Sequence, residues 1–149
     1  MQISTHVSLA DVEKSNTAIR KGIKNTLPPE YLENAKHVAK LYDQIYEHFA
    51  GDVYINSFFR SEKLNKVIGG SSTSQHCFGQ AIDIEGKNGV TNKQVLDYAR
   101  TLDFDQVISE FQDAKGEPQW VHISRKLQGN RGQVLKAVKK SGKTTYVKF

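Results

Sequence analysis

Two histidines and one aspartate are the residues of this sequence best suited to hold a metal ion. Six residues separate His76 from Asp83, and His122 follows much later in the run Trp120–Val121–His122. Two imidazole nitrogens and one carboxylate oxygen leave the fourth position of a tetrahedral site open for water, which is the arrangement of a catalytic zinc. The sequence therefore predicts that His76, Asp83 and His122 bind Zn²⁺ at a site open to water.

The strands predicted around Asp83 and His122 each have one face for the core and one face for chemistry. Side chains alternate between the two faces along a strand. Asp83 therefore points away from Ile82 and Ile84, and His122 shares its face with Trp120. The carboxylate and the imidazole are expected on the open side of a sheet whose other side is packed.

A ten-residue pattern around the first two predicted ligands resembles a known family. The pattern S-x-H-x-x-G-x-A-x-D from Ser74 to Asp83, with a later W-x-H ending at His122, resembles the M15 zinc peptidases. These are peptidoglycan D-alanyl-D-alanine carboxypeptidases and L-alanyl-D-glutamate endopeptidases that share a fold with the hedgehog signalling domain. The likeness covers most of the chain, and it extends to three further segments: Ser57–Ser61 resembles S-G-Y-R-S, Asn65 with Gly69–Gly70 resembles N-x-x-x-G-G, and His6–Leu9 with Phe104–Ile108 is most similar to the small phage-associated members.

The resemblance also implies roles for residues around the metal. It makes His76, Asp83 and His122 the zinc ligands. It implies that Arg60 binds a substrate carboxylate and offsets negative charge during catalysis, since a guanidinium can bind a carboxylate through two parallel hydrogen bonds. Ser74 and Trp120 are expected to contact the substrate as well, although Trp120 would also suit the core.

One position departs from the pattern of many relatives. They carry an acidic general base three residues before the last ligand, where this chain has Gln119, and a glutamine cannot accept the proton. Glu110 is the first candidate to replace it, because strand alternation places it on one face with Gln106 and Ile108, opposite Phe111. Glu117, in the loop before Trp120, is the second candidate, and Asp113 is the third.

Two functions are consistent with these residues. The first is a zinc metallopeptidase, acting as a carboxypeptidase or an endopeptidase, that hydrolyses peptide bonds in peptidoglycan stem peptides through a zinc-activated water. The alternative is a cell-wall or virion-associated binding module of the same fold that keeps the zinc without turnover, which the missing acid at position 119 permits. Cys77 lies beside His76, a pair that could suggest a cysteine hydrolase. Neighbouring side chains in an extended segment point apart, however, so Cys77 is interpreted as a buried small residue.

The elements around these residues predict an α+β domain, with a mainly antiparallel sheet flanked by helices and a hedgehog/DD-peptidase-like fold. Proline in a first turn and an apolar face up to Gly51 predict a long helix from Pro28. A single domain over residues 1–149 is expected, and its other predicted elements are helices at 8–15, 61–68 and from 91, strands at 53–57, 80–84, 105–111 and 119–124, and a final hairpin built from the segment after Val134.

Composition and charge limit the classes of partner that the chain is expected to bind. The chain has 149 residues, a formal net charge of +5 and a single cysteine, so it forms no internal disulfide. Such a basic balance favours polyanions, including nucleic acid, anionic lipid and wall polymers. Nucleic acid is not expected, because the basic residues show no recognised binding pattern. No signal peptide or membrane-inserting segment is predicted, so cytoplasmic synthesis is expected, with action at the cell wall after release or as part of a virion.

Overall fold

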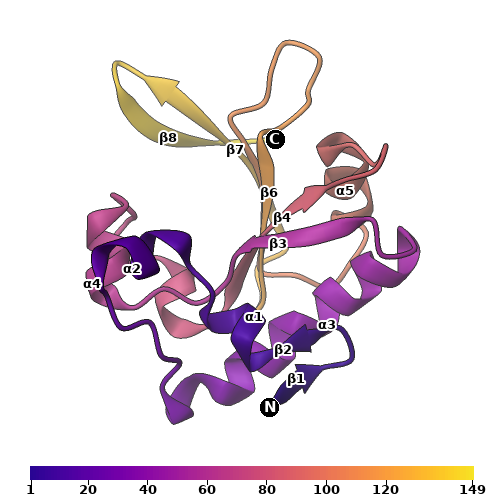
Figure 1. The fold of residues 1–149 in the computed structure, drawn as a ribbon. Coiled ribbons are helices and arrows are strands. Elements are labelled where there is room, and N and C mark those ends of the chain that lie inside the picture. The colour runs from indigo at the N-terminus through magenta and orange to yellow at the C-terminus, as the bar shows by residue number, and fades with distance from the viewer.

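A six-stranded mixed sheet forms the centre of the computed structural model, which describes residues 1–149 (Figure 1). Neighbouring strands are antiparallel except for one parallel pair, β5 with β7. In spatial order the strands are β3 (Val53–Ser57), β4 (Ala81–Gly86), β6 (Trp120–Ser124), β5 (Gln106–Glu110), β7 (Gln133–Lys140) and β8 (Lys143–Lys148). The predicted α+β class with a mainly antiparallel sheet is confirmed.

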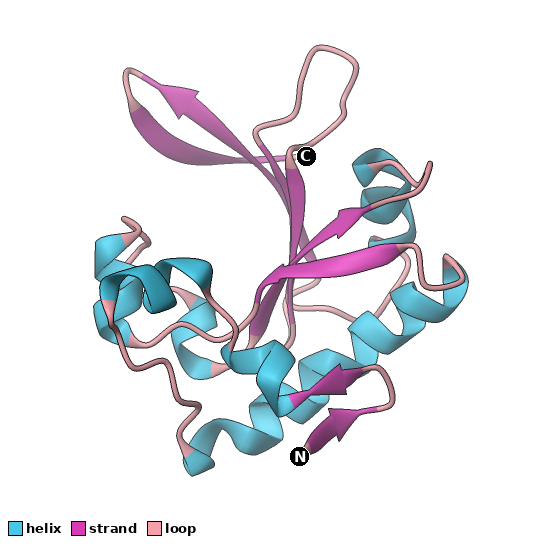
Figure 2. Cartoon of the chain, in the orientation of Figure 1, coloured by secondary structure: helices cyan, strands magenta, loops and turns pink.

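Helices cover one face of this sheet and one of its ends (Figure 2). The long helix α3 (Leu32–His48) follows a 3₁₀ turn, η1 (Pro29–Tyr31), whose prolines begin it as predicted. In α5 (Asn92–Ala99), the helix predicted from residue 91, a capping box is present, because Thr91 and Gln94 exchange side-chain and backbone hydrogen bonds. The remaining helical elements are α1 (Leu9–Glu13), α2 (Asn16–Lys21), α4 (Glu62–Val67) and the 3₁₀ turn η2 (Gln75–Phe78).

The core lies between the sheet and the helices α3 and α5. A cluster of 22 buried apolar residues fills this space. The sheet contributes Ile82 and Ile84 from β4 and Val121 and Ile123 from β6, all with no exposed surface. Because side chains alternate, the other face of β4 and β6 is left for polar side chains. This is the division between a packed face and a chemical face that the sequence predicts.

Four features of the fold were not predicted from the sequence. A small hairpin, β1 (Gln2–Ser4) with β2 (Val7–Ser8), packs on α3, and the helix α2 begins at a Ser15 cap. His76 lies in the 3₁₀ turn η2 instead of an extended segment. These elements are too short for a clear periodicity, and the fourth feature, the parallel pairing of β5 with β7, depends on contacts distant in sequence.

The C-terminal segment forms the predicted hairpin. Strands β7 and β8 pair from Leu135 with Lys148 to Lys140 with Lys143. In Figure 1 this hairpin extends from the sheet at the end opposite to α3. None of the helices is both long enough and apolar enough to span a membrane.

Candidate metal centre

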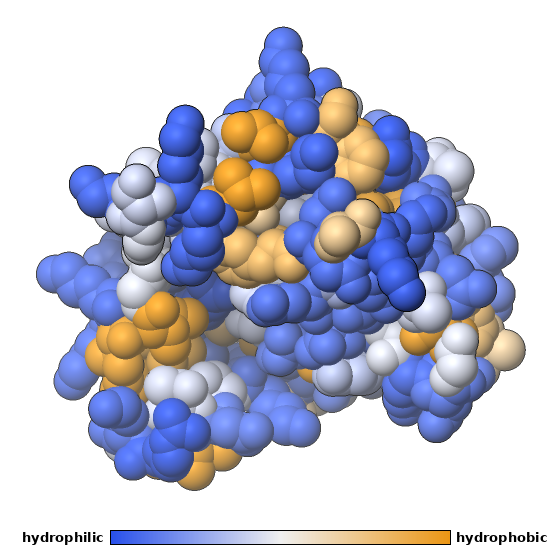
Figure 3. Space-filling model, turned by 90° about the horizontal axis from the view of Figure 1, so that it is seen from above, coloured by the Kyte–Doolittle hydropathy of each residue, from blue (hydrophilic) through white to orange (hydrophobic).

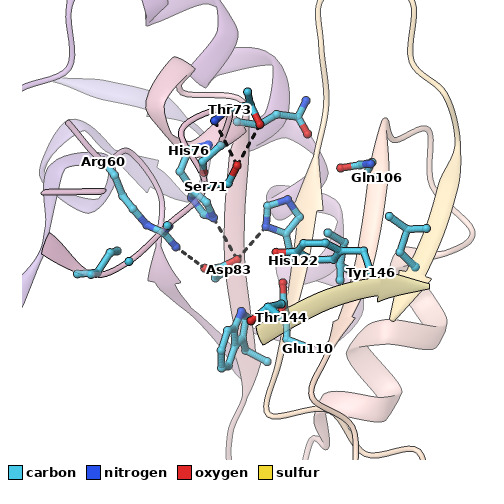
Figure 4. Close-up of a pocket in the computed structure, with 18 of the residues that line it drawn as sticks. Arg60, Ser71, Thr73, His76, Asp83, Gln106, Glu110, His122, Thr144 and Tyr146 are labelled. Atoms are coloured by element: carbon cyan, nitrogen blue, oxygen red, sulfur yellow. Dashed lines mark hydrogen bonds and ion pairs between the residues drawn. The ribbon is translucent and has the colours of Figure 1, made fainter. Parts of the chain in front are cut away.

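Three elements bring the predicted metal ligands together. His76 is carried by η2, Asp83 by β4 and His122 by β6 (Figure 4). Asp83 and His122 lie directly opposite each other in the antiparallel register of β4 and β6. One ligand atom from each of the three residues lies within 4.8 Å of the others, and all three residues are buried. The motif spacing in the sequence thus corresponds to a real convergence of two imidazoles and a carboxylate.

The hydrogen bonding of His76 shows that this cluster fits a cation. Its Nδ1 lies 2.6 Å from the backbone carbonyl of Phe58, and a carbonyl can only accept, so Nδ1 carries the proton. In the neutral ring the Nε2 lone pair then faces Asp83 Oδ1 at 3.2 Å, and this buried Nε2 has no hydrogen-bond partner. Two buried acceptors at this distance repel each other unless a positive charge lies beside them. The donor set of two histidines and one carboxylate is one that zinc binds.

The charge states of the cluster also suit a metal. Burial is the main cause that lowers the pKa of His76 below its usual value, so the imidazole stays neutral and its lone pair remains available. Burial alone would raise the pKa of Asp83, but the neighbouring His76 and His122 side chains hold it well below its usual range. The site therefore presents a neutral His76 imidazole and an ionised carboxylate near neutral pH.

Arg60 holds Asp83 from the side away from the histidines. Its Nη2 donates to Asp83 Oδ2 at 3.1 Å, while Nε and Nη1 donate to Ser57 Oγ and Asn65 Oδ1. Three of the five guanidinium N–H groups are thus used within the protein, which leaves two for a ligand. Asn65 itself donates to the Ser71 carbonyl and packs against Gly70, where a Cβ atom would collide with its side chain. Arg60 lines the cleft and also orients a predicted ligand, as outer-shell partners of metal sites do.

The turn that carries His76 is anchored at both its start and its side. Ser74 caps η2, with its Oγ accepting from the backbone N–H of His76 at 3.3 Å. Gln75 donates to the buried carboxylate of Asp105, which also accepts two side-chain hydrogen bonds and a backbone hydrogen bond from Arg131. Burial alone would raise the pKa of Asp105, but these hydrogen bonds lower it to about 2. Asp105 therefore links the turn that carries His76 to the segment leading into β7.

Replacing Asp105 with asparagine is expected to destabilise the protein at neutral pH and less so in acid. The folded pKa lies below the usual value of 3.8, so the stabilisation is complete above about pH 4 and is lost as the pH falls toward 2. A shift of this size corresponds to about 2 kcal/mol of unfolding free energy. Urea denaturation of both proteins at pH 7 and pH 3 measures it, with Asp97→Asn as a control in an exposed ion pair. An equal loss at both pH values would contradict the assigned cause.

Among the three candidate bases, Glu110 is the one that lines the cleft beside the metal cluster. The cleft has a volume of about 770 Å³, and Glu110 shares its lining with Gln106, Ile108 and all three predicted ligands. Glu110 is buried, and burial, aided by the charge of Asp83, raises its pKa to about 7 against the lowering effects of His122 and Arg60. A carboxylate with this pKa can both accept and release a proton near neutral pH.

The two other candidates and Gln119 have structural positions outside the cleft. Glu117 accepts from the backbone N–H groups of Asn92 and Lys93, so it caps the first turn of α5. Asp113 accepts from the backbone of Lys115 and Glu117 and is fully exposed. Neither residue lines the cleft, and Gln119 is exposed next to β6. The geometry thus favours Glu110 over Glu117 and Asp113.

Aromatic side chains form one end of the cleft. Trp120, predicted to contact substrate or fill the core, lines the cleft and packs edge-on against Phe111 at 5.7 Å between ring centroids. The expectation that Phe111 points away from Glu110 is wrong. Strand β5 ends at Glu110, and Phe111 has a φ of 53°, which breaks the alternation and brings its ring to the cleft. A left-handed residue other than glycine costs about 1 kcal/mol, so this orientation is imposed by its surroundings.

The contribution of the C-terminal hairpin to the cleft was not predicted from the sequence. Lys139, Thr144 and Tyr146 line it, and Tyr146 lies beside the predicted ligands in Figure 4. The register gives the reason: Glu110 lies opposite Ala137 and Ala137 opposite Tyr146, so all three share one face. Cys77 is half-buried, so the prediction of a buried residue is only partly correct. It lies outside the main cleft, and burial raises the pKa of its thiol.

Comparison with protein families gives a match over most of the chain. The family model described as Peptidase M15 matches residues 5–124 of the chain. The matched range includes the three clustered ligands, Arg60 and Glu110, and it ends before β7 begins. No curated protein matches the chain.

Proposed function

Because the chain belongs to the peptidase M15 family, we propose that it is a zinc-dependent peptidase that hydrolyses peptide bonds in the stem peptides of bacterial peptidoglycan. The observation that carries this proposal is the lone pair of His76 Nε2, which is buried and faces the Asp83 carboxylate without a partner. His76, Asp83 and His122 would hold the ion. When bound, zinc would lower the pKa of a water molecule to about 7 and polarise the carbonyl of the scissile bond.

In this proposal Glu110 acts first as the general base and then as the general acid. Its carboxylate accepts a proton from the attacking water as the bond to the carbonyl carbon forms, and it returns a proton to the amine nitrogen as the peptide bond breaks. The burial of Glu110 in the cleft lining supports this role, because it raises the pKa of Glu110 to about 7. Glu110 would thus replace the acid that many relatives carry where this chain has Gln119.

Arg60 would orient both the site and the substrate. Its contact with Asp83 Oδ2 would fix the carboxylate ligand, and because Arg60 also lines the cleft, its two remaining N–H groups could bind a substrate carboxylate. Stem peptides carry free carboxylates, which match such a cation. Ser74 and Trp120 would complete the substrate contacts, Ser74 at the metal-bearing turn and Trp120 at the aromatic end of the cleft.

Elemental analysis and peptide mapping test the proposed function together. We expect the purified chain to contain about one zinc per molecule and to cleave purified muropeptides at a single type of bond, as read by mass spectrometry. The position of that bond separates a carboxypeptidase from an endopeptidase. Cleavage that persists after complete removal of metal by a chelator would refute the proposal. A protein that retains zinc and binds muropeptides without cleaving them would support the non-catalytic module instead.

A further inference from the structure

The positive charge of this protein is concentrated at its C-terminal end. Residues 125–149 contain eight Lys and Arg and no Asp or Glu, whereas residues 1–124 contain 13 Lys and Arg against 16 Asp and Glu. Five of the eight are lysines of the β7–β8 hairpin, here called the basic hairpin (residues 133–148). The overall charge of +5 is therefore the sum of a slightly acidic body and a strongly basic segment.

The basic hairpin has no acidic side chains to neutralise it. Arg125 pairs with Asp103 and Arg131 with Asp105, but the lysines of β7 and β8 make no ion pair in the structure. Lys136 lies over the ring of Phe149 and Lys139 over the ring of Phe111, and such cation–π contacts compensate the charge of a lysine only weakly. The field of these lysines therefore extends into solvent.

The needs of the fold do not account for this composition. Lysine on an edge strand hinders sheet-to-sheet association, which explains Lys143 and Lys148 on the edge strand β8. Strand β7, however, is paired on both sides and carries three lysines of its own. Lys140 also lies directly opposite Lys143, and like charges in opposed positions destabilise a hairpin. The hairpin thus carries more positive charge than its stability favours.

The basic hairpin also borders the cleft. Lys139 and Tyr146 are part of the cleft lining, and the strand β8 passes beside His122 and Glu110 (Figure 4). Seen from the hairpin side, the surface is mostly hydrophilic, with separate small hydrophobic clusters (Figure 3). A chain molecule lying in the cleft would therefore continue across the lysines, and these favour negative charge in whatever continues there.

We propose that the basic hairpin docks the enzyme on peptidoglycan by attracting the carboxylates of stem peptides that neighbour the one in the cleft. This inference rests on the proposed function, because it takes the polymer that supplies the substrate as the partner. Lysines that point into solvent suit such a polymer, since their attraction needs no fixed register and acts over about a Debye length. The docking raises the local concentration of substrate and turns the cleft toward it.

Sedimentation with insoluble peptidoglycan tests the docking without requiring cleavage. The full chain is mixed at 4 °C with sacculi freed of phosphodiester polymers by hydrofluoric acid, and the bound fraction is measured after pelleting. The variant K140E/K143E/K148E reverses three exposed hairpin lysines outside the cleft lining, and the control K24E/K87E/K115E reverses three exposed lysines elsewhere. Circular dichroism establishes that both variants are folded.

We expect the affinity of the hairpin variant for sacculi to fall at least about tenfold below that of the wild type. The affinity of the control should change by less than about threefold. Added salt, or conversion of the sacculus carboxylates to amides, should weaken the wild type in the same way. Equal losses for the two variants, or none for the hairpin variant, would overturn the docking surface. Tighter retention of the protein on duplex DNA than on sacculi at the same salt would also overturn it. The same holds if the protein binds only sacculi that still carry the phosphodiester polymers. Docking without any cleavage would refute the proposed peptidase function and leave this inference standing.

Discussion

Replacing Glu110 with glutamine is expected to reduce the turnover rate for muropeptides by about a thousandfold while the protein keeps its zinc. Glutamine has nearly the same shape as glutamate, but it cannot accept the proton of the attacking water. Glu110 is not among the three clustered ligands, so metal content should not change. Burial already disfavours the ionised form of Glu110, so a neutral side chain there should not destabilise the fold.

Two further substitutions make this result specific to Glu110. Glu117→Gln removes the second candidate base, which caps α5, and Asp113→Asn removes the third, which is exposed. Both are expected to keep most of the activity, with zinc measured in each preparation. If Glu117→Gln lost turnover and Glu110→Gln kept it, the assignment of the base would be wrong and the loop before Trp120 would have to move on substrate binding.

The convergence of Asp83 and His122 could be predicted because it is set by short-range rules. Alternation along β4 and β6 placed Asp83 and His122 on the face opposite Ile82 and Ile84, and the structure has them opposite each other in the ladder. The same rule placed Glu110 beside them. It failed one residue later, at Phe111, because a positive φ ends the alternation there. A sequence pattern contains no signal for that change other than the end of the strand.

Other parts of the site depend on contacts between segments far apart in sequence. The pairing of β7 with β5 brings Tyr146 and Lys139 to the cleft, and no local pattern near residue 140 indicates that partner. The hydrogen bond from Arg60 to Asp83 likewise depends on the antiparallel pairing of β3 with β4, because Arg60 follows the end of β3 and Asp83 lies on β4. Sequence similarity could suggest that Arg60 matters, but only the structure shows that it supports a ligand as well as facing the cleft.

Replacing His76 with alanine is expected to abolish both zinc binding and muropeptide cleavage. The substitution leaves two of three ligands, and it removes the imidazole whose Nε2 lone pair has no partner within the protein. The clearest readout is thermal stability with and without added zinc. A ligand that binds only the folded state stabilises it by about 2.7 kcal/mol at a concentration of 100 times its Kd. We expect zinc to raise the melting temperature of the wild type and to leave that of His76→Ala unchanged.

Comparing each protein with its own metal-free form makes this test independent of folding defects. Alanine at position 76 also leaves the Phe58 carbonyl without its hydrogen bond and so lowers the stability of the metal-free variant, but this loss cancels in the zinc-dependent difference. His37→Ala is the matched control, since His37 lies on α3 outside the cluster and should retain the zinc response. A wild-type protein whose stability did not respond to zinc, or a His76→Ala protein that responded as strongly as the control, would show that the ion binds elsewhere. The unpaired Nε2 would then need another positively charged partner.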